Sequence, residues 1–119
     1  MTSRVAAIDC GTNSLRLLIA DVDPIRRTLT DLDRRLEIVR LGQGVDKTGR
    51  LAPEALERTL RTLGDYARVI TASQVGGVRM VATSATRDAA NSAEFTSGVV
   101  DVLGLAPEVL TGEDRKSVV

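Results

Sequence analysis

Apolar and polar positions alternate along the chain in runs that predict three strands before the first long helix. The first two strands are the short apolar runs Val5–Ile8 and Leu15–Ala20, which lie on either side of a polar break. Thr28–Leu41 contains a third strand, for which its second half, Leu36–Arg40, is the better candidate. Because the links between these strands are too short for a helix, we expect the three strands to be antiparallel neighbours.

The stretch Pro53–Thr71 predicts the clearest helix. Its apolar residues recur three or four positions apart, which places them on one face, and Pro53 suits the first position of a helix. Gly64 predicts a close packing contact, because glycine inside a helix otherwise costs about 1 kcal/mol relative to alanine. The apolar face, which we expect to pack against the sheet, consists of Leu56, Leu60, Leu63, Ala67 and Ile70.

The second half of the chain predicts a crossover followed by a helix and a strand. Val78–Ala82 is a short apolar run after the long helix, so we expect it to lie parallel to a neighbouring strand. Ser92–Gly104 is predicted to be helical, with Ser92 as its N-cap, and Glu108–Thr111 is a last strand. Val45–Leu51 is expected to be a loop. The order βββαβαβ predicts an α/β fold with a mixed sheet.

Composition narrows the classes of function. The 119 residues fit one domain, and 16 basic residues balance 16 acidic ones, so no overall field attracts the chain to nucleic acid or to a membrane surface. There is no leader pattern and no apolar run of about 20 residues. Without histidine, a histidine-based triad and the usual zinc sites are excluded, and Cys10 is expected to be a packed residue. A single cysteine fits a reducing compartment, and we expect a cytoplasmic protein.

The polar break Asp9–Ser14 (DCGTNS) is a candidate phosphate site. Gly11 can take a positive φ and lets a ligand approach the backbone, and successive N–H groups in a turn form a nest for anions. Asp9 offers a hard oxygen for Mg²⁺. The same residues suit a plain hairpin turn, so both interpretations stay open on composition alone. Hydroxyl and amide groups are added by Thr12, Asn13 and Ser14.

A second candidate site lies where the run Val78–Ala82 ends. Thr83–Arg87 (TSATR) leads into a predicted helix start, and a helix N-terminus points free N–H groups at an anion. Arg87 adds a group that can bind phosphate through two hydrogen bonds, although a Ser/Thr helix cap followed by a surface arginine is the alternative. Ligands of α/β sheets gather at the carboxyl ends of strands, so we expect the two loops to lie side by side.

These stretches resemble the exopolyphosphatase/guanosine-pentaphosphate phosphatase (Ppx/GppA) family. Val5–Ala20 is similar to the first phosphate loop of the actin/Hsp70/sugar-kinase superfold, and its DCGTNS residues are similar to that family in particular. The resemblance covers Arg4 to about Glu113 and implies a ribonuclease H-like (actin-like ATPase) lobe. The other family stretches have counterparts in Ile38–Asp46 (IVRLGQGVD), Ala82–Asn91 (ATSATRDAAN) and Val109–Glu113 (VLTGE).

The resemblance also implies a reaction and a site. The reaction is hydrolysis of a terminal phosphoanhydride in inorganic polyphosphate or guanosine pentaphosphate, with Mg²⁺ as the cofactor. The first loop would wrap a phosphate, the second would hold the same polyphosphate from the other side, and Asp9 would orient Mg²⁺ or the loop. The implied phosphate-binding residues are Gly11, Thr12, Asn13, Ser14, Ser84, Ala85, Thr86 and Arg87.

The chain departs from the family pattern after Gly112. The glutamate that serves as the base in the family lies three residues after this glycine, where the present chain has Arg115. A second phosphate loop, of the Asp-Xaa-Gly-Gly-Gly-Ser type found in the family's partner lobe, is absent. We therefore expect residues 1–113 to be an N-terminal lobe, inactive by itself, whose C-terminal lobe is missing. For the full-length protein, a homodimer is one oligomeric state left open.

Residues 114–119 (DRKSVV) are expected to be non-native. They break the family pattern where the glutamate is due, and they include Lys116, one of two lysines in the chain. The peptide is what GAT CGG AAG AGC GTC GTG encodes, and this string with an in-frame TAG stop resembles a common sequencing adapter. A real charged tail is the alternative, because short polar ends are often unconstrained.

Two other functions stay open at this point. An ATP-binding lobe of an acetate- or sugar-kinase relative would share Asp9, Gly11 and Thr12, but it would give no role to Ala82–Asn91. A non-catalytic sensor of guanosine tetraphosphate or pentaphosphate would use the same loops without the glutamate.

Overall fold

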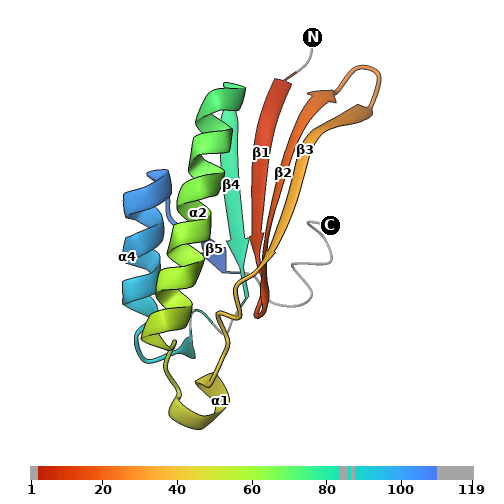
Figure 1. Cartoon of the computed structure of the whole chain (residues 1–119). Helices are drawn as coiled ribbons and strands as arrows, with labels where there is room; N and C mark the ends of the chain where they lie inside the picture. The colour runs from red at the N-terminus through yellow and green to blue at the C-terminus, as the bar shows by residue number, and fades with distance from the viewer. Residues whose placement is uncertain (1–2, 84–85, 87, 110–119) are drawn as a thin grey trace.

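The chain folds as a mixed β-sheet with helices α2 and α4 on one of its faces (Figure 1). The structure is a computed structural model that describes residues 3–83, 86 and 88–109. The described residues form a five-stranded sheet in the order β3-β2-β1-β4-β5. The strands are β1 (Ser3–Cys10), β2 (Ser14–Asp23), β3 (Thr28–Ile38), β4 (Gly77–Ala82) and β5 (Glu108–Val109), and the helices are α1 (Val45–Thr48), α2 (Pro53–Ser73) and α4 (Ser92–Leu103).

The strand directions confirm the predicted α/β class. Strand β1 pairs antiparallel with β2, and β2 pairs antiparallel with β3. After the crossover through α2, β4 lies parallel to β1, and β5 lies parallel to β4. The expected last strand extends beyond Val109 to residues 110 and 111, which lie outside the described residues, as do Arg115 and the tail 114–119.

Two boundaries before the long helix differ from the prediction. Strand β3 begins at Thr28 and ends at Ile38, because it pairs along the whole of β2, and this pairing outweighs the low strand preference of its Asp and Arg residues. The ladder skips Leu32, which produces a bulge. Val45–Thr48, expected to be a loop, forms the short helix α1 between two glycines with positive φ, Gly44 and Gly49.

Helix α2 supplies one side of the core, but its buried face is rotated from the predicted one. Leu63 is fully buried and Ile70 is buried, as predicted, whereas Leu56 and Leu60 are half-buried at the side of this face. The buried face is rotated because it includes Thr59 and Tyr66, polar residues that a pattern of apolar positions leaves out. Their hydroxyl groups form hydrogen bonds within the protein. The buried residues of α2 are Ala55, Thr59, Leu63, Tyr66 and Ile70.

The two hydroxyl groups buried on α2 each have a partner. Thr59 donates to the carbonyl of Ala55 one turn earlier, at 2.8 Å. Tyr66 reaches across to the sheet and donates to the carbonyl of Leu15, also at 2.8 Å. This second hydrogen bond joins the helix to strand β2 immediately after the first loop. Because the phenol oxygen has a partner, its burial does not carry the free-energy cost of an unsatisfied hydroxyl.

The close contact between helices comes from a different glycine than the one predicted. A Cβ atom on Gly98 of α4 would lie 2.5 Å from Cδ1 of Leu60, so only glycine lets the two helices approach this closely. At Gly64, nothing outside its own helix lies within 4 Å of where a Cβ would stand, so the predicted contact there is wrong. Helix α4 begins after Asn91 rather than after the predicted Ser92 N-cap, and it ends at Leu103, which is followed by Gly104 with a positive φ.

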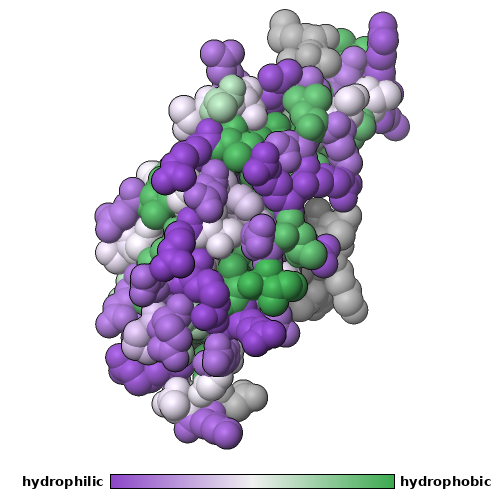
Figure 2. Space-filling model, viewed as in Figure 1, coloured by the Kyte–Doolittle hydropathy of each residue, from purple (hydrophilic) through white to green (hydrophobic). Residues whose placement is uncertain are grey.

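The strands alternate between the core and the opposite face of the sheet. Inward-facing residues of β1 and β2 are buried, and Cys10 is fully buried among them. Seen from the side of Figure 1, hydrophilic residues predominate over the outward side of α2, while apolar side chains are visible in the region of β3 (Figure 2). The exposed apolar residues of β3 are Leu29, Leu32, Leu36 and Ile38. Within the described part of the chain, the helices are too short or too polar to cross a membrane.

We expect Leu63→Ala to lower the free energy of unfolding by about 2–5 kcal/mol, because it opens a cavity in the core. Leu63 has no exposed surface, whereas Leu36 is 53% exposed and provides the matched control. Leu36→Ala should change the same quantity by less than about 0.5 kcal/mol. Urea unfolding of the two variants measures both effects, and equal losses would contradict the core described above.

Burial raises the pKa of Tyr66 from 10.0 to about 12. The unfolded chain loses this proton first, so we expect the free energy of unfolding to fall as the pH rises from about 10 to about 12. Tyr66 is the only tyrosine, so the near-ultraviolet absorbance of its phenolate reports the titration directly. An identical phenolate titration in buffer and in urea would contradict the burial of this group.

Candidate functional site

The first candidate loop is a tight turn between β1 and β2. The N–H of Gly11 donates to the carbonyl of Ser14 at 2.8 Å and closes the turn. The side chains of Thr12 and Asn13 are exposed, and Ser14 is half-buried. Gly11 does not have the positive φ that its composition suggested. Its contribution is an unobstructed backbone beside the exposed polar groups of the turn.

Residues 39–42, which follow β3, hold the first loop in place through backbone hydrogen bonds. The carbonyl of Asn13 accepts hydrogen bonds from the N–H groups of Val39 at 2.8 Å and Arg40 at 2.9 Å. The carbonyl of Thr12 accepts one from Gly42 at 2.8 Å. A Cβ atom on Gly42 would stand well inside the van der Waals contact distance of Cγ2 of Thr12. Residues 39–42 therefore fix the position of the loop, and the sequence did not predict this support.

Helix α2 holds the supporting segment in turn. Nε of Arg58 donates to the carbonyl of Val39 at 2.7 Å, and Nη2 donates to Oε1 of Gln43 at 3.1 Å. The loop thus rests on residues 39–43, and these rest on a 21-residue helix. A site supported by rigid elements keeps its donors in place for a ligand.

The second candidate loop starts beside the first. Cys10 and Ala82 are partners at the carboxyl ends of the parallel strands β1 and β4, and the next N–H, of Thr83, donates to the carbonyl of Cys10 at 3.1 Å. Thr86 is 3% exposed, and its hydroxyl donates to the carbonyl of Thr83 at 2.7 Å. The other predicted members of this loop, Ser84, Ala85 and Arg87, lie outside the described residues.

The hydroxyl of Thr83 is a buried polar group for which the described residues around the two loops provide no hydrogen-bond partner. Oγ1 is buried, and no hydrogen-bond partner for it is found among the residues that the structure describes. A buried hydroxyl without a partner costs about 1–3 kcal/mol. Such an atom at the junction of the two loops is a group that a bound ligand or water would satisfy.

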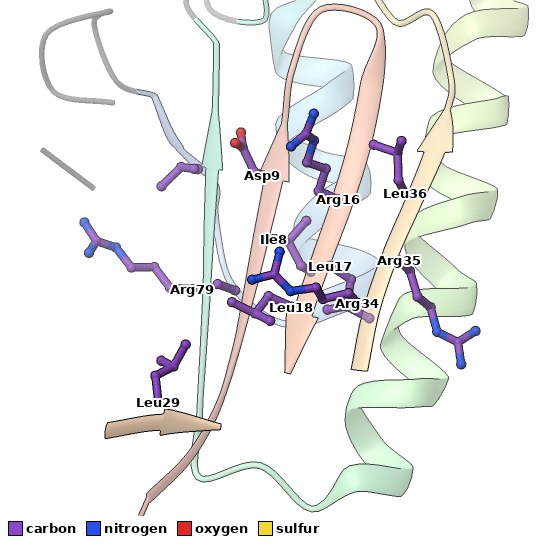
Figure 3. A pocket seen from close by; sticks show the side chains of 12 residues that line it. Ile8, Asp9, Arg16, Leu17, Leu18, Leu29, Arg34, Arg35, Leu36 and Arg79 are labelled. Atoms are coloured by element: carbon purple, nitrogen blue, oxygen red, sulfur yellow. The ribbon is translucent and has the colours of Figure 1, made fainter. Parts of the chain in front are cut away.

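Asp9 lies on the face of the sheet that the helices leave open (Figure 3). Its half-buried side chain lines a groove of about 700 Å³ on this face. Arg16 is its partner across the β1–β2 ladder and lines the same groove, together with Arg34 and Arg79. Arg79 is bound to Glu108 by two hydrogen bonds of 2.6 and 3.0 Å, which hold the pKa of Glu108 below its usual value.

Arg16 was not among the predicted site residues, although the alternation of side chains between the two faces of a strand could have identified it. An antiparallel pair places directly opposed residues on the same face, and Asp9 and Arg16 are directly opposed. The structure therefore adds one cationic side chain next to the only carboxylate of the stretch Asp9–Ser14, that of Asp9.

Asp9 is the residue that could hold Mg²⁺, and this role stays a prediction. Across the described ranges, no three or more His, Cys, Asp or Glu side chains gather as a preformed metal cage. Mg²⁺ is commonly bound by one or two carboxylates together with phosphate oxygens and water. A single carboxylate beside a candidate phosphate site fits an ion that arrives with its phosphate ligand.

Comparison with known proteins gives a family match over most of the chain. The model of the Ppx/GppA phosphatase family matches residues 18–117. Exopolyphosphatase 2 of Mycobacterium tuberculosis is 56% identical over 120 aligned residues, which cover 95% of this chain and 38% of that protein. The chain thus spans well under half the length of this curated relative.

Solved structures agree with the sequence match. An exopolyphosphatase-like protein superposes with a TM-score of 0.91 at 47% identity, covering 98% of this chain and 35% of the other. The Ppx/GppA family member from Aquifex aeolicus superposes with a TM-score of 0.88 at 38% identity, covering 96% of this chain and 37% of the other.

We expect Gly42→Ala to lower the free energy of unfolding by about 1–3 kcal/mol, because the new methyl group collides with Thr12 and overpacks the support of the first loop. Gly64→Ala is the matched control. It has open space and should raise the same free energy by up to about 1 kcal/mol through helix propensity. Urea unfolding of both variants tests the contact, and a neutral Gly42→Ala would contradict it.

Proposed function

Because this chain belongs to the Ppx/GppA phosphatase family, we propose that it is the phosphate-binding lobe of an exopolyphosphatase. Its substrate is inorganic polyphosphate or guanosine pentaphosphate, and the bond broken is the terminal phosphoanhydride. The observation that carries this proposal is the hydrogen bond from Thr83 to Cys10, which joins the starts of the two candidate loops at one edge of the sheet. Two anion-binding turns at one edge suit a ligand with several phosphoryl groups.

The first loop binds the terminal phosphoryl group through its backbone N–H groups and the side chains of Thr12, Asn13 and Ser14. The residues Ser84, Ala85, Thr86 and Arg87 hold the same polyphosphate from the other side, and the guanidinium of Arg87 supplies a bidentate contact. The unsatisfied hydroxyl of Thr83 supports a ligand at this junction. The hydroxyl of Thr86, already bonded to the carbonyl of Thr83, contributes by shaping the turn.

We propose that Asp9 takes part through Mg²⁺ carried by the polyphosphate. When bound, the ion neutralises phosphate charge, which phosphoryl transfer needs along with correct positioning of the reactants. The carboxylate of Asp9 lies at the carboxyl end of β1, separated from Gly11 of the loop by Cys10 alone, which is where it can orient such an ion. We also propose a cytoplasmic setting, because Cys10 is a free, buried cysteine and a reducing compartment keeps thiols reduced.

Hydrolysis requires a group that accepts a proton from water while the oxygen of that water bonds to the terminal phosphorus and the bridging P–O bond breaks. In the family pattern this group is a glutamate, and Arg115 occupies its position. A guanidinium is always protonated and accepts no proton. We therefore propose that the 119-residue chain binds polyphosphate without releasing phosphate, and that hydrolysis belongs to longer family members that have the glutamate.

Calorimetric titration with tripolyphosphate, ATP and guanosine pentaphosphate, each with and without Mg²⁺, tests this function. We expect tripolyphosphate to bind, Mg²⁺ to strengthen its binding, and a phosphate-release assay to stay at background. Arg87→Ala should weaken the binding of tripolyphosphate about tenfold or more, because a charge-assisted hydrogen bond contributes about 1.5–3 kcal/mol.

Arg68→Ala serves as the matched control for that variant. Arg68 lies on α2 in an exposed ion pair with Asp65, so its loss should leave the affinity unchanged. Binding of ATP in preference to tripolyphosphate would favour a kinase-like lobe. Binding of guanosine pentaphosphate alone would favour a sensor, and binding of none of the three would contradict the proposal.

A further inference from the structure

Most of the arginines that the structure describes already have an anionic partner inside the fold. Seven arginines form ion pairs with Asp or Glu among the described residues. Arg58 is also engaged, through Val39 and Gln43. Arg40 is one of the few arginines in the described part of the chain whose exposed guanidinium has no hydrogen bond or ion pair, and it lies beside the first loop.

Arg40 is held at the first loop by its own backbone. Its N–H donates to the carbonyl of Asn13 at 2.9 Å, and its own carbonyl accepts from Gln43 at 3.0 Å. Its φ is +52°, in the left-handed region that residues with a Cβ rarely adopt. A strained backbone persists only where its surroundings impose it, and such positions cluster at functional sites. The strain here positions an unpartnered cation beside the loop.

A shallow hollow lies next to this guanidinium. It is lined by Asn13, Ile38, Arg40, Gly42 and Gln43, so it shares Asn13 with the first loop. Its polar groups are the amides of Asn13 and Gln43 and the cation of Arg40, and it includes no carboxylate. This donor-rich lining suits an anion, and a planar guanidinium matches the geometry of phosphate.

We propose that Arg40 is a phosphate-binding residue and that this hollow is a second phosphate subsite. It binds the phosphoryl group next to the one held by the first loop. This inference rests on the proposed function, because it assigns a further contact to the same polyphosphate. A ligand with one phosphoryl group occupies the loop alone, whereas a longer ligand also reaches Arg40. The subsite therefore favours chains over orthophosphate.

The turn between β2 and β3 offers a matched control, Arg27. Arg27 is also exposed, has a φ of +55°, and forms no ion pair within the described residues. It lies at the opposite end of β2 from the first loop (Figure 1). Ten strand residues separate the two ends by about 30 Å, which is beyond the Debye length of about 8 Å at physiological salt.

The experiment compares Arg40→Gly with Arg27→Gly by calorimetric titration with tripolyphosphate and with orthophosphate at fixed salt. Both substitutions remove one charge and relieve one left-handed φ, so neither should reduce the stability of the chain. We expect Arg40→Gly to weaken the binding of tripolyphosphate about tenfold or more and that of orthophosphate by less than about threefold. Arg27→Gly should bind both ligands as the unsubstituted chain does.

A second variant tests whether the effect of Arg40→Gly arises from a changed loop backbone rather than from the lost guanidinium. Arg40→Lys keeps the charge and the Cβ but loses the bidentate fork, so it should show an intermediate loss for tripolyphosphate. If the unsubstituted chain binds tripolyphosphate and Arg40→Gly binds it equally well, the subsite is wrong and the proposed function stands. Equal losses in Arg40→Gly and Arg27→Gly would also overturn the subsite. No binding of tripolyphosphate by the unsubstituted chain would overturn the proposed function itself.

Discussion

The parallel pairing of β1 with β4 is the constraint on which the rest of this structure depends. Two parallel neighbours cannot be joined by a hairpin, so the chain between them has to cross one face of the sheet. Helix α2 makes this crossing and packs its buried face against β2. The same pairing brings the carboxyl ends of β1 and β4 together, with Cys10 beside Ala82. The core and the meeting of the two loops therefore have one cause.

Helix α2 joins this core to the candidate site at two points. Tyr66 is bonded to the carbonyl of Leu15, which directly follows the first loop, and Arg58 is bonded to the carbonyl of Val39 in the segment that supports the loop. Both contacts use a long side chain from a well-packed helix to hold the backbone. A shift of α2 would thus move both the start of β2, which follows the loop, and the segment that supports the loop. The loop is exposed to ligands, but its backbone is set by buried elements.

Local sequence signals predicted the order of the strands and of the two long helices along the chain, because apolar periodicity and glycine or proline boundaries act within short segments. They misjudged features that depend on distant partners. Strand β3 is set by its pairing with β2, and the close helix contact uses Gly98 because Leu60 lies opposite it. The support of the first loop by residues 39–42 was missed for the same reason, since backbone hydrogen bonds leave little trace in side-chain chemistry. The loop motif itself was recognisable because its chemistry is local.

The alternation of β1 ties the core to the chemistry of the loop. Ile8 and Cys10 point into the core, while Asp9 between them lines the groove on the open face (Figure 3). A slip of one residue in the pairing of β1 would exchange these faces and bury the carboxylate of Asp9 under α2. An ionised carboxylate in an apolar core is strongly unfavourable unless it is paired. The apolar residues that drive folding and the carboxylate that precedes the loop therefore select the same register, so the sheet that is most stable is also the one that presents Asp9 beside the first candidate loop.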